Sequence, residues 1–342
     1  MTEAKFRTIP DMVRDRVARY GTDRRVFREK KDGRWIETDW SEFQRRVGRI
    51  ALGLMNRGFS LRDRGAVYAY NRPEWLIMDF AYQFAGGATA PVYMNNTPEE
   101  TAYVLKHSEA KFVLVDDLDR LNRVLDRIDE LPDLQAIVTI DSLKAPEHPK
   151  VISLSRLEND GAELSGWSPK LDARIAEIDP EDPFTIVYTS GTTGVPKGAM
   201  LSHRNFLWVL QASVEIDIPR LDHEFMISYL PLAHVAQRIG DYLGVYNGAT
   251  ISFAESLEKF PENLKEIGPT SFVAVPRILE KVYLKVMGGA EAKGGAALKI
   301  FKWAEGLARE RHAREVYGKP TRPLFDLQWR LAERLVYSKI KD

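Results

Sequence analysis

The chain has 342 residues, with 49 Lys and Arg against 49 Asp and Glu, and it contains no Cys. The balanced charge gives no overall field that favours nucleic acid. The absence of Cys excludes disulfides, thiolate nucleophiles and Cys-ligated metals. The length exceeds the ~250–300 residues at which a single hydrophobic core stops growing, which predicts two packed lobes.

The start of the chain, from Met1 to Phe6, lacks the apolar segment of a signal peptide. No uncharged apolar run in the sequence approaches the ~18 residues that a membrane-spanning helix needs. We therefore expect a cytoplasmic protein, and we leave open a peripheral contact with the membrane surface.

Strand-type and helix-type segments alternate in the first half of the chain. The spacing of apolar residues predicts strands over 65–70, 88–94, 111–115 and 135–140. Helices are predicted over 73–84 and 97–107, and the second begins with Thr97, Pro98 and Glu100, which is the pattern of a capping box. This alternation predicts an α/β fold, with a mostly parallel sheet and helices on its faces.

A stretch from 141 to 182 has little periodicity and more Pro, Ser and charge. We interpret it as a surface connection with one short helix over 154–159. It is the predicted boundary between two α/β parts, residues 1–180 and residues 181–342.

The second half returns to alternation. The predicted strands cover 184–188, 225–230, 249–253 and 271–275, and the predicted helices cover 203–214, 235–246 and most of the chain from 277 onward. Residues 281–342 carry 14 Lys and Arg against 7 Asp and Glu, with aromatic and aliphatic residues between them. Two interpretations stay open: helices packed on the body with a solvated basic face, or a basic amphipathic surface that meets anionic membrane.

A loop rich in glycine and hydroxyl groups follows the strand predicted over 184–188. It reads Tyr188-Thr-Ser-Gly-Thr-Thr-Gly-Val-Pro-Lys-Gly198, and the nine positions from Ser190 to Gly198 contain three Gly, three hydroxyl residues and one Lys. Successive backbone N–H groups in such a turn form an anion-binding nest, and a lysine adds a point charge suited to phosphate. It is not a Walker A loop, because Pro196 stands where that motif has its second Gly.

This loop resembles the phosphate loop of the adenylate-forming superfamily, which includes acyl-CoA synthetases, luciferases and nonribosomal-peptide adenylation domains. Residues 84–92 and 229–235 resemble two further segments of that family, and the second of these lines its acyl site. Residues 274–283 and 331–340 are similar to the long-chain fatty acyl-CoA synthetases. Gln237 is a departure, because that branch often has Glu there.

The resemblance implies a fold of stacked, mostly parallel sheets with flanking helices, here an incomplete N-terminal large domain. It also implies ATP-dependent activation of a fatty acid to an acyl-adenylate and then to acyl-CoA, with ATP, Mg²⁺ and CoA. The residues expected to bind nucleotide are Thr189, Ser190, Gly191, Thr192, Thr193, Gly194 and Lys197.

Three further roles are expected: those of Thr189 and His234 follow from the resemblance, and that of Arg277 from its place after Pro276 at a predicted strand end, where ligands of α/β proteins bind. Thr189 is the candidate Mg²⁺ contact. His234 is the candidate catalytic residue, placed to donate a hydrogen bond near the acyl carboxylate, and both His234 and Arg277 are candidates for substrate binding. His234 and Arg277 each have a structural alternative. His234 can be a structural residue whose hydrogen bonds stay within the protein, and Arg277 can be the partner of Glu280 in an ion pair.

Several motifs that the family carries further along are not in this sequence. They are a Tyr-Gly-x-Thr-Glu segment, a ribose-binding Asp, a hinge and a small C-terminal domain with a catalytic Lys; Tyr317 to Arg322 resembles the first but has no Glu. We therefore expect the N-terminal part of a longer enzyme, with the C-terminal portion required for full activity. The alternatives are another carboxylate-adenylating ligase, the adenylation part of a carboxylate reductase, or a nucleotide-binding module without turnover.

Overall fold

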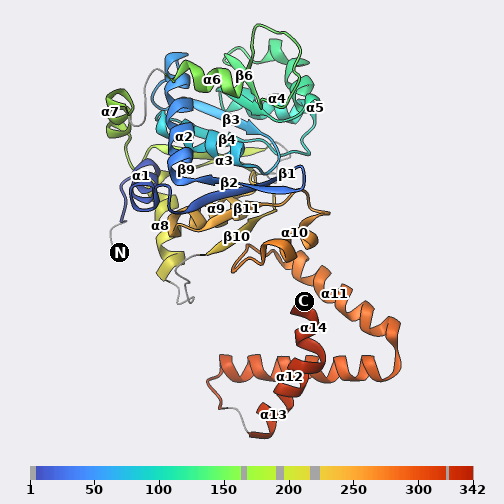
Figure 1. Cartoon of the computed structure of the whole chain (residues 1–342). Coiled ribbons are helices and arrows are strands. Elements are labelled where there is room, and N and C mark those ends of the chain that lie inside the picture. Colours follow the sequence, from blue (N-terminus) through green and yellow to red (C-terminus); the bar gives the residue numbers. More distant parts are fainter. Residues whose placement is uncertain (1–4, 163–167, 190–195, 216–223, 321–322, 342) are drawn as a thin grey trace. The chain divides into compact units, whose positions relative to one another are not determined.

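The computed structural model divides into two compact units, residues 1–273 and residues 274–342 (Figure 1). The residues that it describes are 5–162, 168–189, 196–215, 224–320 and 323–341. The boundary lies far from residue 180, where the sequence analysis placed it.

The first unit contains two sheets. The larger has seven strands in the order β7-β6-β5-β3-β4-β8-β9, and all neighbours are parallel except β8 and β9. Its strands are β3 (Arg64–Tyr68), β4 (Ala88–Pro91), β5 (Ala110–Val115), β6 (Ala136–Thr139), β7 (Val151–Ser153), β8 (Pro183–Thr189) and β9 (Lys197–Ser202).

The smaller sheet has four strands in the order β10-β11-β1-β2, and its pairs are parallel except β1 with β2. The strands are β1 (Arg25–Lys31), β2 (Arg34–Asp39), β10 (Phe225–Ser228) and β11 (Thr250–Phe253). Each sheet therefore takes strands from both sides of residue 180. The change in composition over 141–182 marks surface connections and not a domain boundary.

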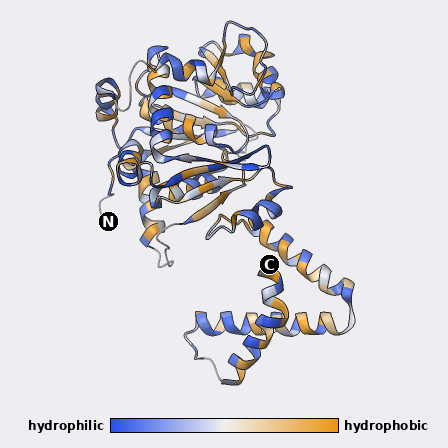
Figure 2. Cartoon of the chain, viewed as in Figure 1, coloured by the Kyte–Doolittle hydropathy of each residue, from blue (hydrophilic) through white to orange (hydrophobic). Residues whose placement is uncertain are grey.

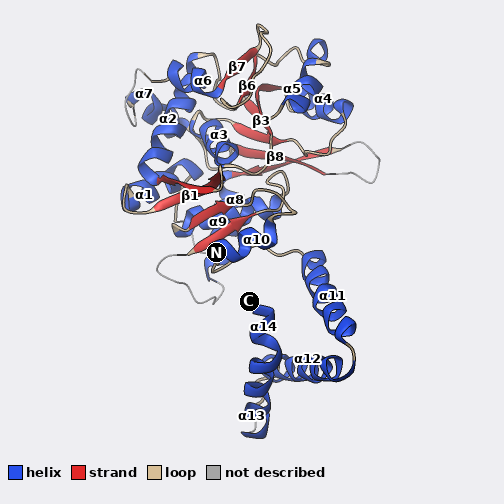
Figure 3. Cartoon of the chain, turned by 45° about the vertical axis from the view of Figure 1, so that its right-hand side comes forward, coloured by secondary structure: helices blue, strands red, loops and turns tan. Residues whose placement is uncertain are grey.

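Helices pack between the two sheets and on the outer face of the larger one (Figure 3). The helices that contribute buried residues to the shared core are α1 (Ile9–Tyr20), α2 (Trp40–Asn56), α3 (Pro73–Phe84), α6 (Leu154–Asp160), α7 (Pro169–Glu177), α8 (His203–Glu215) and α9 (Val235–Asn247). The outer face of the larger sheet packs against α4 (Pro98–His107) and α5 (Leu118–Leu125). The first unit also contains α10 (Phe260–Ile267) and the 3₁₀ turn Ile128–Glu130.

Helix α3 is buried along its whole length, because it packs against β3 and β4 of one sheet and β1 of the other. Pro73 suits its first position, since that residue needs no backbone partner there. The buried face includes the polar residues Glu74, Asp79 and Gln83. Buried polar groups require hydrogen-bond partners, so this helix must be the centre of an internal polar network.

The alternation predicted for the first half is confirmed, and α3 has the predicted bounds. The capping box of α4 is also present: Glu100 N–H donates to Thr97 Oγ1 at 3.2 Å, and Thr97 N–H donates to Glu100 Oε2 at 2.9 Å. Three predictions are wrong or incomplete. The connection over 141–182 also contains β7 and α7, β9 was not predicted, and Ser271 makes one parallel bridge to Met226 where a full strand was expected.

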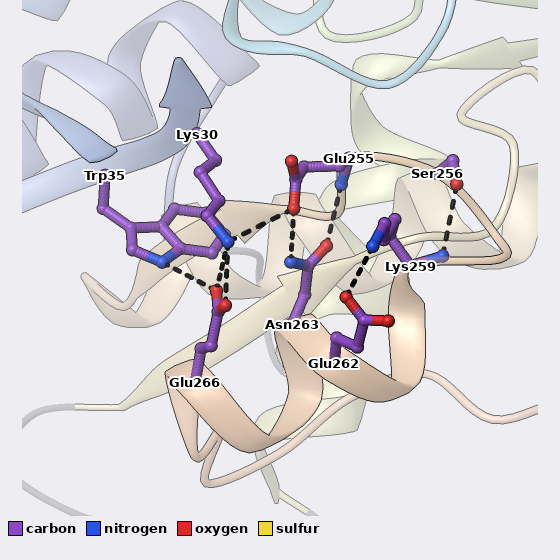
Figure 4. Close-up of polar contacts among 8 residues, drawn as sticks. All are labelled: Lys30, Trp35, Glu255, Ser256, Lys259, Glu262, Asn263 and Glu266. Atoms are coloured by element: carbon purple, nitrogen blue, oxygen red, sulfur yellow. Dashed lines mark hydrogen bonds and ion pairs between the residues drawn. The ribbon is translucent and has the colours of Figure 1, made fainter. Parts of the chain in front are cut away.

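A polar cluster ties α10 to the hairpin of β1 and β2 (Figure 4). Lys30 Nζ lies 2.8 Å from both carboxylate oxygens of Glu266 and 3.4 Å from Glu255, and Trp35 Nε1 donates to Glu266. Asn263 donates to Glu255 at 2.8 Å. The hydrogen bond to Glu266 raises the pKa of Lys30 against a smaller effect of burial. The cluster fixes α10 on the surface of the smaller sheet.

The second unit is helical, as predicted. It contains α11 (Pro276–Lys293), α12 (Gly295–Val316), α13 (Pro323–Ala332), the π-helical turn Glu333–Tyr337 and α14 (Ser338–Lys341). Its buried core consists of Ala304, Leu307, Phe325 and Ala332. Apolar and polar residues are interleaved along its helices (Figure 2), and Leu279 and Leu284 are 59% and 65% exposed. Within the described part of the chain, none of the helices has the length and apolar character of a membrane span.

Candidate functional site

The two ends of the phosphate loop are held by the hairpin of β8 and β9. Thr189 ends β8, Lys197 begins β9, and the two residues are paired across the antiparallel ladder. Such pairing brings their Cα atoms to about 5 Å. Both side chains are exposed. The other predicted nucleotide-binding residues, Ser190, Gly191, Thr192, Thr193 and Gly194, lie outside the described residues.

A cavity of about 340 Å³ lies beside this hairpin. Its lining includes Tyr93, Glu100, Val104, Tyr188, Thr189 and Pro196. Tyr93 follows β4 and Thr189 ends β8, so the cavity lies where two neighbouring parallel strands end, which is the usual place for ligands in α/β sheets. The volume is within the range of small-molecule sites.

Helix α4 contacts the hairpin through two tyrosines. Tyr103 Oη donates to the carbonyl of Pro196 at 2.9 Å, which ties the end of the loop to α4. Tyr188 Oη lies 2.9 Å from His107 Nδ1. Burial raises the pKa of Tyr188 to about 12, so its phenol is protonated at neutral pH. These contacts fix the base of the loop.

A magnesium ion prefers hard oxygen ligands, above all carboxylates. The Glu100 carboxylate and the Thr189 hydroxyl line the same cavity, so oxygen donors of both kinds are available there. Glu100 Oε2 already accepts from Thr97 N–H. Across the described ranges, no group of three or more His, Cys, Asp or Glu could hold a metal ion. The oxygen atoms of Glu100 and Thr189 suit a weak contact to a Mg²⁺ ion whose other ligands are phosphate oxygens. The role of Thr189 as a Mg²⁺ contact stays a prediction.

His234 occupies the N-cap of α9, just beyond the carboxyl end of β10. Its Nδ1 accepts from Ala236 N–H at 3.1 Å. An acceptor nitrogen carries no proton, so the neutral ring has its proton on Nε2. The side chain is exposed. His234 therefore caps a helix with one nitrogen and can donate a hydrogen bond with the other.

Arg277 lies in the first turn of α11, in the unit formed by residues 274–342. Its side chain is exposed. No ion pair between Arg277 and Glu280 occurs in the part of the chain that the structure describes. Its predicted role in substrate binding stays a prediction.

Arg238, which was not predicted as a site residue, connects the helix capped by His234 with the strand that ends at Thr189. Arg238 lies one helical turn after His234 and donates to Asp79 Oδ2 at 3.0 Å and Oδ1 at 2.5 Å. It also donates to the hydroxyl of Thr185 on β8, four residues before Thr189. The signal that could have found this network is Asp79, a carboxylate within the strongly apolar segment 73–84 that requires a buried partner.

A family model described as AMP-binding enzyme matches residues 13–322. The long-chain-fatty-acid–CoA ligase ACSBG1 of Homo sapiens is 31% identical over 346 residues, which cover 98% of this chain and 46% of that protein. The corresponding ACSBG2 of Xenopus laevis is 29% identical, with 98% of this chain and 45% of that protein covered. The chain thus spans somewhat less than half the length of these relatives.

Two solved structures share the fold. The didomain of a carboxylic acid reductase from Segniliparus rugosus in complex with AMP has a TM-score of 0.72 at 20% identity, covering 86% of this chain and 46% of that one. A long-chain-fatty-acid-CoA ligase from Archaeoglobus fulgidus has a TM-score of 0.69 at 18% identity, covering 83% and 55%. The family model matches most of the length of this chain, which shows that the chain belongs to the AMP-binding enzyme family.

Proposed function

We propose that this chain serves the ATP-dependent activation of a long-chain fatty acid to acyl-adenylate and then to acyl-CoA. One observation carries the proposal: Thr189 and Lys197 face each other at the base of a glycine- and hydroxyl-rich loop, beside a cavity at the carboxyl ends of β4 and β8. The names of the relatives that are about 30% identical support a long-chain acid.

The first step would join one carboxylate oxygen to the α-phosphorus of ATP as the bond to pyrophosphate breaks. Lys197 and loop N–H groups would neutralise charge on the phosphates, as preorganised donors do in such reactions. His234 Nε2 would donate to the fatty carboxylate and orient it. A Mg²⁺ ion near Thr189 would add charge neutralisation. In the second step the thiol sulfur of CoA would attack the acyl carbon and release its proton to solvent, and AMP would leave with the electrons of the broken bond.

Full activity is proposed to require the portion by which the relatives exceed this chain, since the chain spans about 45% of their length. This portion would complete the site over the phosphate loop. The isolated chain is then expected to bind nucleotide and acid while forming little acyl-adenylate.

Hydrolysis-resistant acyl-adenylate analogues test the proposed substrate class without requiring turnover. The probes are palmitoyl, octanoyl and benzoyl sulfamoyl adenosine, and the measurement is the Kd of each for the purified chain by calorimetry. Each buried CH₂ contributes about 0.8 kcal/mol, so palmitoyl should bind at least about tenfold more tightly than octanoyl.

Sulfamoyl adenosine without an acyl group is the control for the nucleotide part. A preference for the benzoyl probe would contradict the long-chain proposal and favour an aryl ligase. Equal Kd values for all probes and for the control would show that the chain recognises only the nucleotide part and not the acyl group.

A further inference from the structure

The segment Tyr229–His234 connects β10 to α9 and carries His234 at its end. Leu232 and Ala233 are buried, whereas His234 is exposed. The apolar side chains therefore pack into the protein and leave the imidazole at the surface. The position of the imidazole ring depends on which contacts hold the backbone of this segment.

Asn71 holds that backbone with both ends of its side-chain amide. Nδ2 donates to the carbonyl of Leu230 at 2.6 Å and to Ser228 Oγ at 3.0 Å. Oδ1 accepts from Leu232 N–H at 3.0 Å. Three contacts from one amide thus fix the chain on both sides of Pro231.

Asn71 comes from a different sheet. It lies between β3 of the seven-stranded sheet and α3, whereas the segment that it holds follows β10 of the four-stranded sheet. The contact joins the carboxyl ends of strands in two separate sheets. Ligand sites in α/β proteins gather at such ends.

The position of Asn71 is itself fixed. The neighbouring Tyr70 N–H donates to Asp116 Oδ2 at 2.9 Å, and Asp116 follows directly after β5. Asp116 is buried and also accepts from Arg120 at 3.1 Å. The amide of Asn71 is therefore presented from a rigid connection and not from a free loop.

Two further side chains, one on α9 and one within the segment itself, also hold this backbone. Gln237 on α9 accepts from Leu230 N–H at 3.2 Å and donates to Asp241 at 2.7 Å. Tyr229 Oη donates to the carbonyl of Val273 at 2.8 Å. Asn71 adds to these the link to the seven-stranded sheet, which also carries the phosphate loop.

We propose that Asn71 is a positioning residue that sets where His234 meets the fatty carboxylate, an inference that rests on the proposed function. The side chain must donate and accept at once, which an amide does and a carboxylate does not. A carboxylate of the same shape would place an oxygen against the carbonyl of Leu230, where Nδ2 now lies at 2.6 Å.

The test compares Asn71→Asp, which keeps the acceptor for Leu232 N–H, with Asn71→Ala, which removes all three contacts. The matched controls are Asn56→Asp and Asn56→Ala. Asn56 also donates from Nδ2 to a backbone carbonyl, that of Asp160, at 2.9 Å, but it lies on α2 and makes no contact to the segment.

The three hydrogen bonds of Asn71 to the segment 228–232 form a clamp on this backbone. Hydrogen–deuterium exchange measures this clamp directly, because Leu232 N–H donates to Asn71. We expect exchange over residues 230–234 to accelerate about tenfold in Asn71→Ala and less in Asn71→Asp, with no change there in the Asn56 variants. Unchanged exchange in Asn71→Ala would overturn the inference, whatever the chain binds.

Binding of palmitate and of MgATP then separates positioning from a general loss of structure. Asn71→Ala should weaken palmitate at least fivefold and change the Kd of MgATP less than twofold. Equal losses for both ligands would overturn the positioning role. A wild-type chain that binds no palmitate would contradict the proposed function and the positioning role with it, while the exchange data would still establish or exclude the clamp.

Discussion

Arg238 and Asp79 form a buried pair with two hydrogen bonds, from Nε at 3.0 Å and from Nη2 at 2.5 Å, although 159 positions separate them in sequence. The side chains are 1% and 0% exposed. Asp79 also accepts from Thr89 at 2.6 Å and Tyr242 at 2.7 Å. Through Arg238 and Thr185 the pair connects the helix capped by His234 with the strand that ends at Thr189.

Breaking this pair should destabilise the protein strongly. Arg238→Met leaves the Asp79 carboxylate buried without its charged partner, and loss of one member of such a pair costs about 3–5 kcal/mol. Urea unfolding at pH 7 measures the free energy of unfolding. The control is Arg204→Met, which breaks an exposed ion pair with Glu181 and should cost less than about 1 kcal/mol. Equal losses in the two variants would show that the buried pair contributes no more to stability than the exposed one.

His203 should make the protein less stable in mild acid. It is almost fully buried, and burial lowers its pKa to about 4. The unfolded state binds a proton below pH 6.5 while the native state does not, so stability that is complete above pH 6.5 falls as the pH drops toward 4. Across this pH range the loss in the free energy of unfolding approaches about 3 kcal/mol.

The variant His203→Gln checks this, because it keeps an acceptor for Ile9 N–H, which now donates to His203 Nδ1 at 3.3 Å. Its free energy of unfolding should change less between pH 7 and pH 4.5 than that of the wild type. Parallel curves for the two proteins would refute the prediction.

Asp241 should make the protein less stable as the pH rises, which is the opposite of the effect of His203. Burial raises its pKa to about 7, against smaller effects of Ser228 and Gln237 that lower it. Between pH 3.8 and 7 the unfolded state ionises while the native state keeps its proton, so the contribution of this group to stability falls as the pH rises and is lowest above 7.

Asp241→Asn cannot ionise and keeps an oxygen for Gln237. It should match the wild type at pH 4 and exceed it by up to about 4 kcal/mol at pH 8. Chemical unfolding at both pH values measures this, with the exposed Asp119→Asn as control. A variant that is no more stable than the wild type at pH 8 would show that burial does not raise the pKa of Asp241 in the folded protein.

His234→Asp separates the two uses of the imidazole. Aspartate is a good N-cap, so the acceptor for Ala236 N–H is kept and the free energy of unfolding should change by less than about 1 kcal/mol. A carboxylate in place of the Nε2 donor repels a fatty carboxylate, so palmitate should bind about tenfold more weakly. His234→Asn keeps the cap without the charge and should lie between. Unaltered palmitate binding in His234→Asp would exclude a contact to the carboxylate.

Local signals in the sequence predicted the elements that local chemistry determines. The bounds of α3 follow from Pro73 at its start and its apolar spacing, and α4 follows from its capping box. Strand β9 was missed because Lys197 to Ser202 becomes a strand through pairing with β8, and the start of the segment reads as part of a loop. Helix α7 was missed although Ser168 and Pro169 form a recognisable start.

The sequence supplied candidate residues for the site but not their assembly. The loop string predicts phosphate binding and its neighbours predict a role for His234, and both stay predictions. Asn71 and Arg238 could not be placed, because the partners of Asn71 and the charged partner of Arg238, Asp79, lie more than 150 positions away and no periodic pattern connects them. For the same reason the change in composition near residue 180 was misleading: strand pairing between distant segments decides the division of the chain.

We propose that the loop between Thr189 and Lys197 binds the phosphates of ATP. Calorimetric titration of the purified chain with MgATP tests it, comparing the wild type with Lys197→Ala and Lys197→Arg. The control is Lys170→Ala, which removes an exposed lysine that contacts Asn56.

A charged hydrogen bond contributes about 1.5–3 kcal/mol, so Lys197→Ala should bind MgATP at least about tenfold more weakly. Lys197→Arg should retain most of the affinity, and Lys170→Ala should match the wild type. A chain that does not bind MgATP, or a Lys197→Ala variant that binds it as tightly as Lys170→Ala, would exclude phosphate binding by Lys197 and this loop.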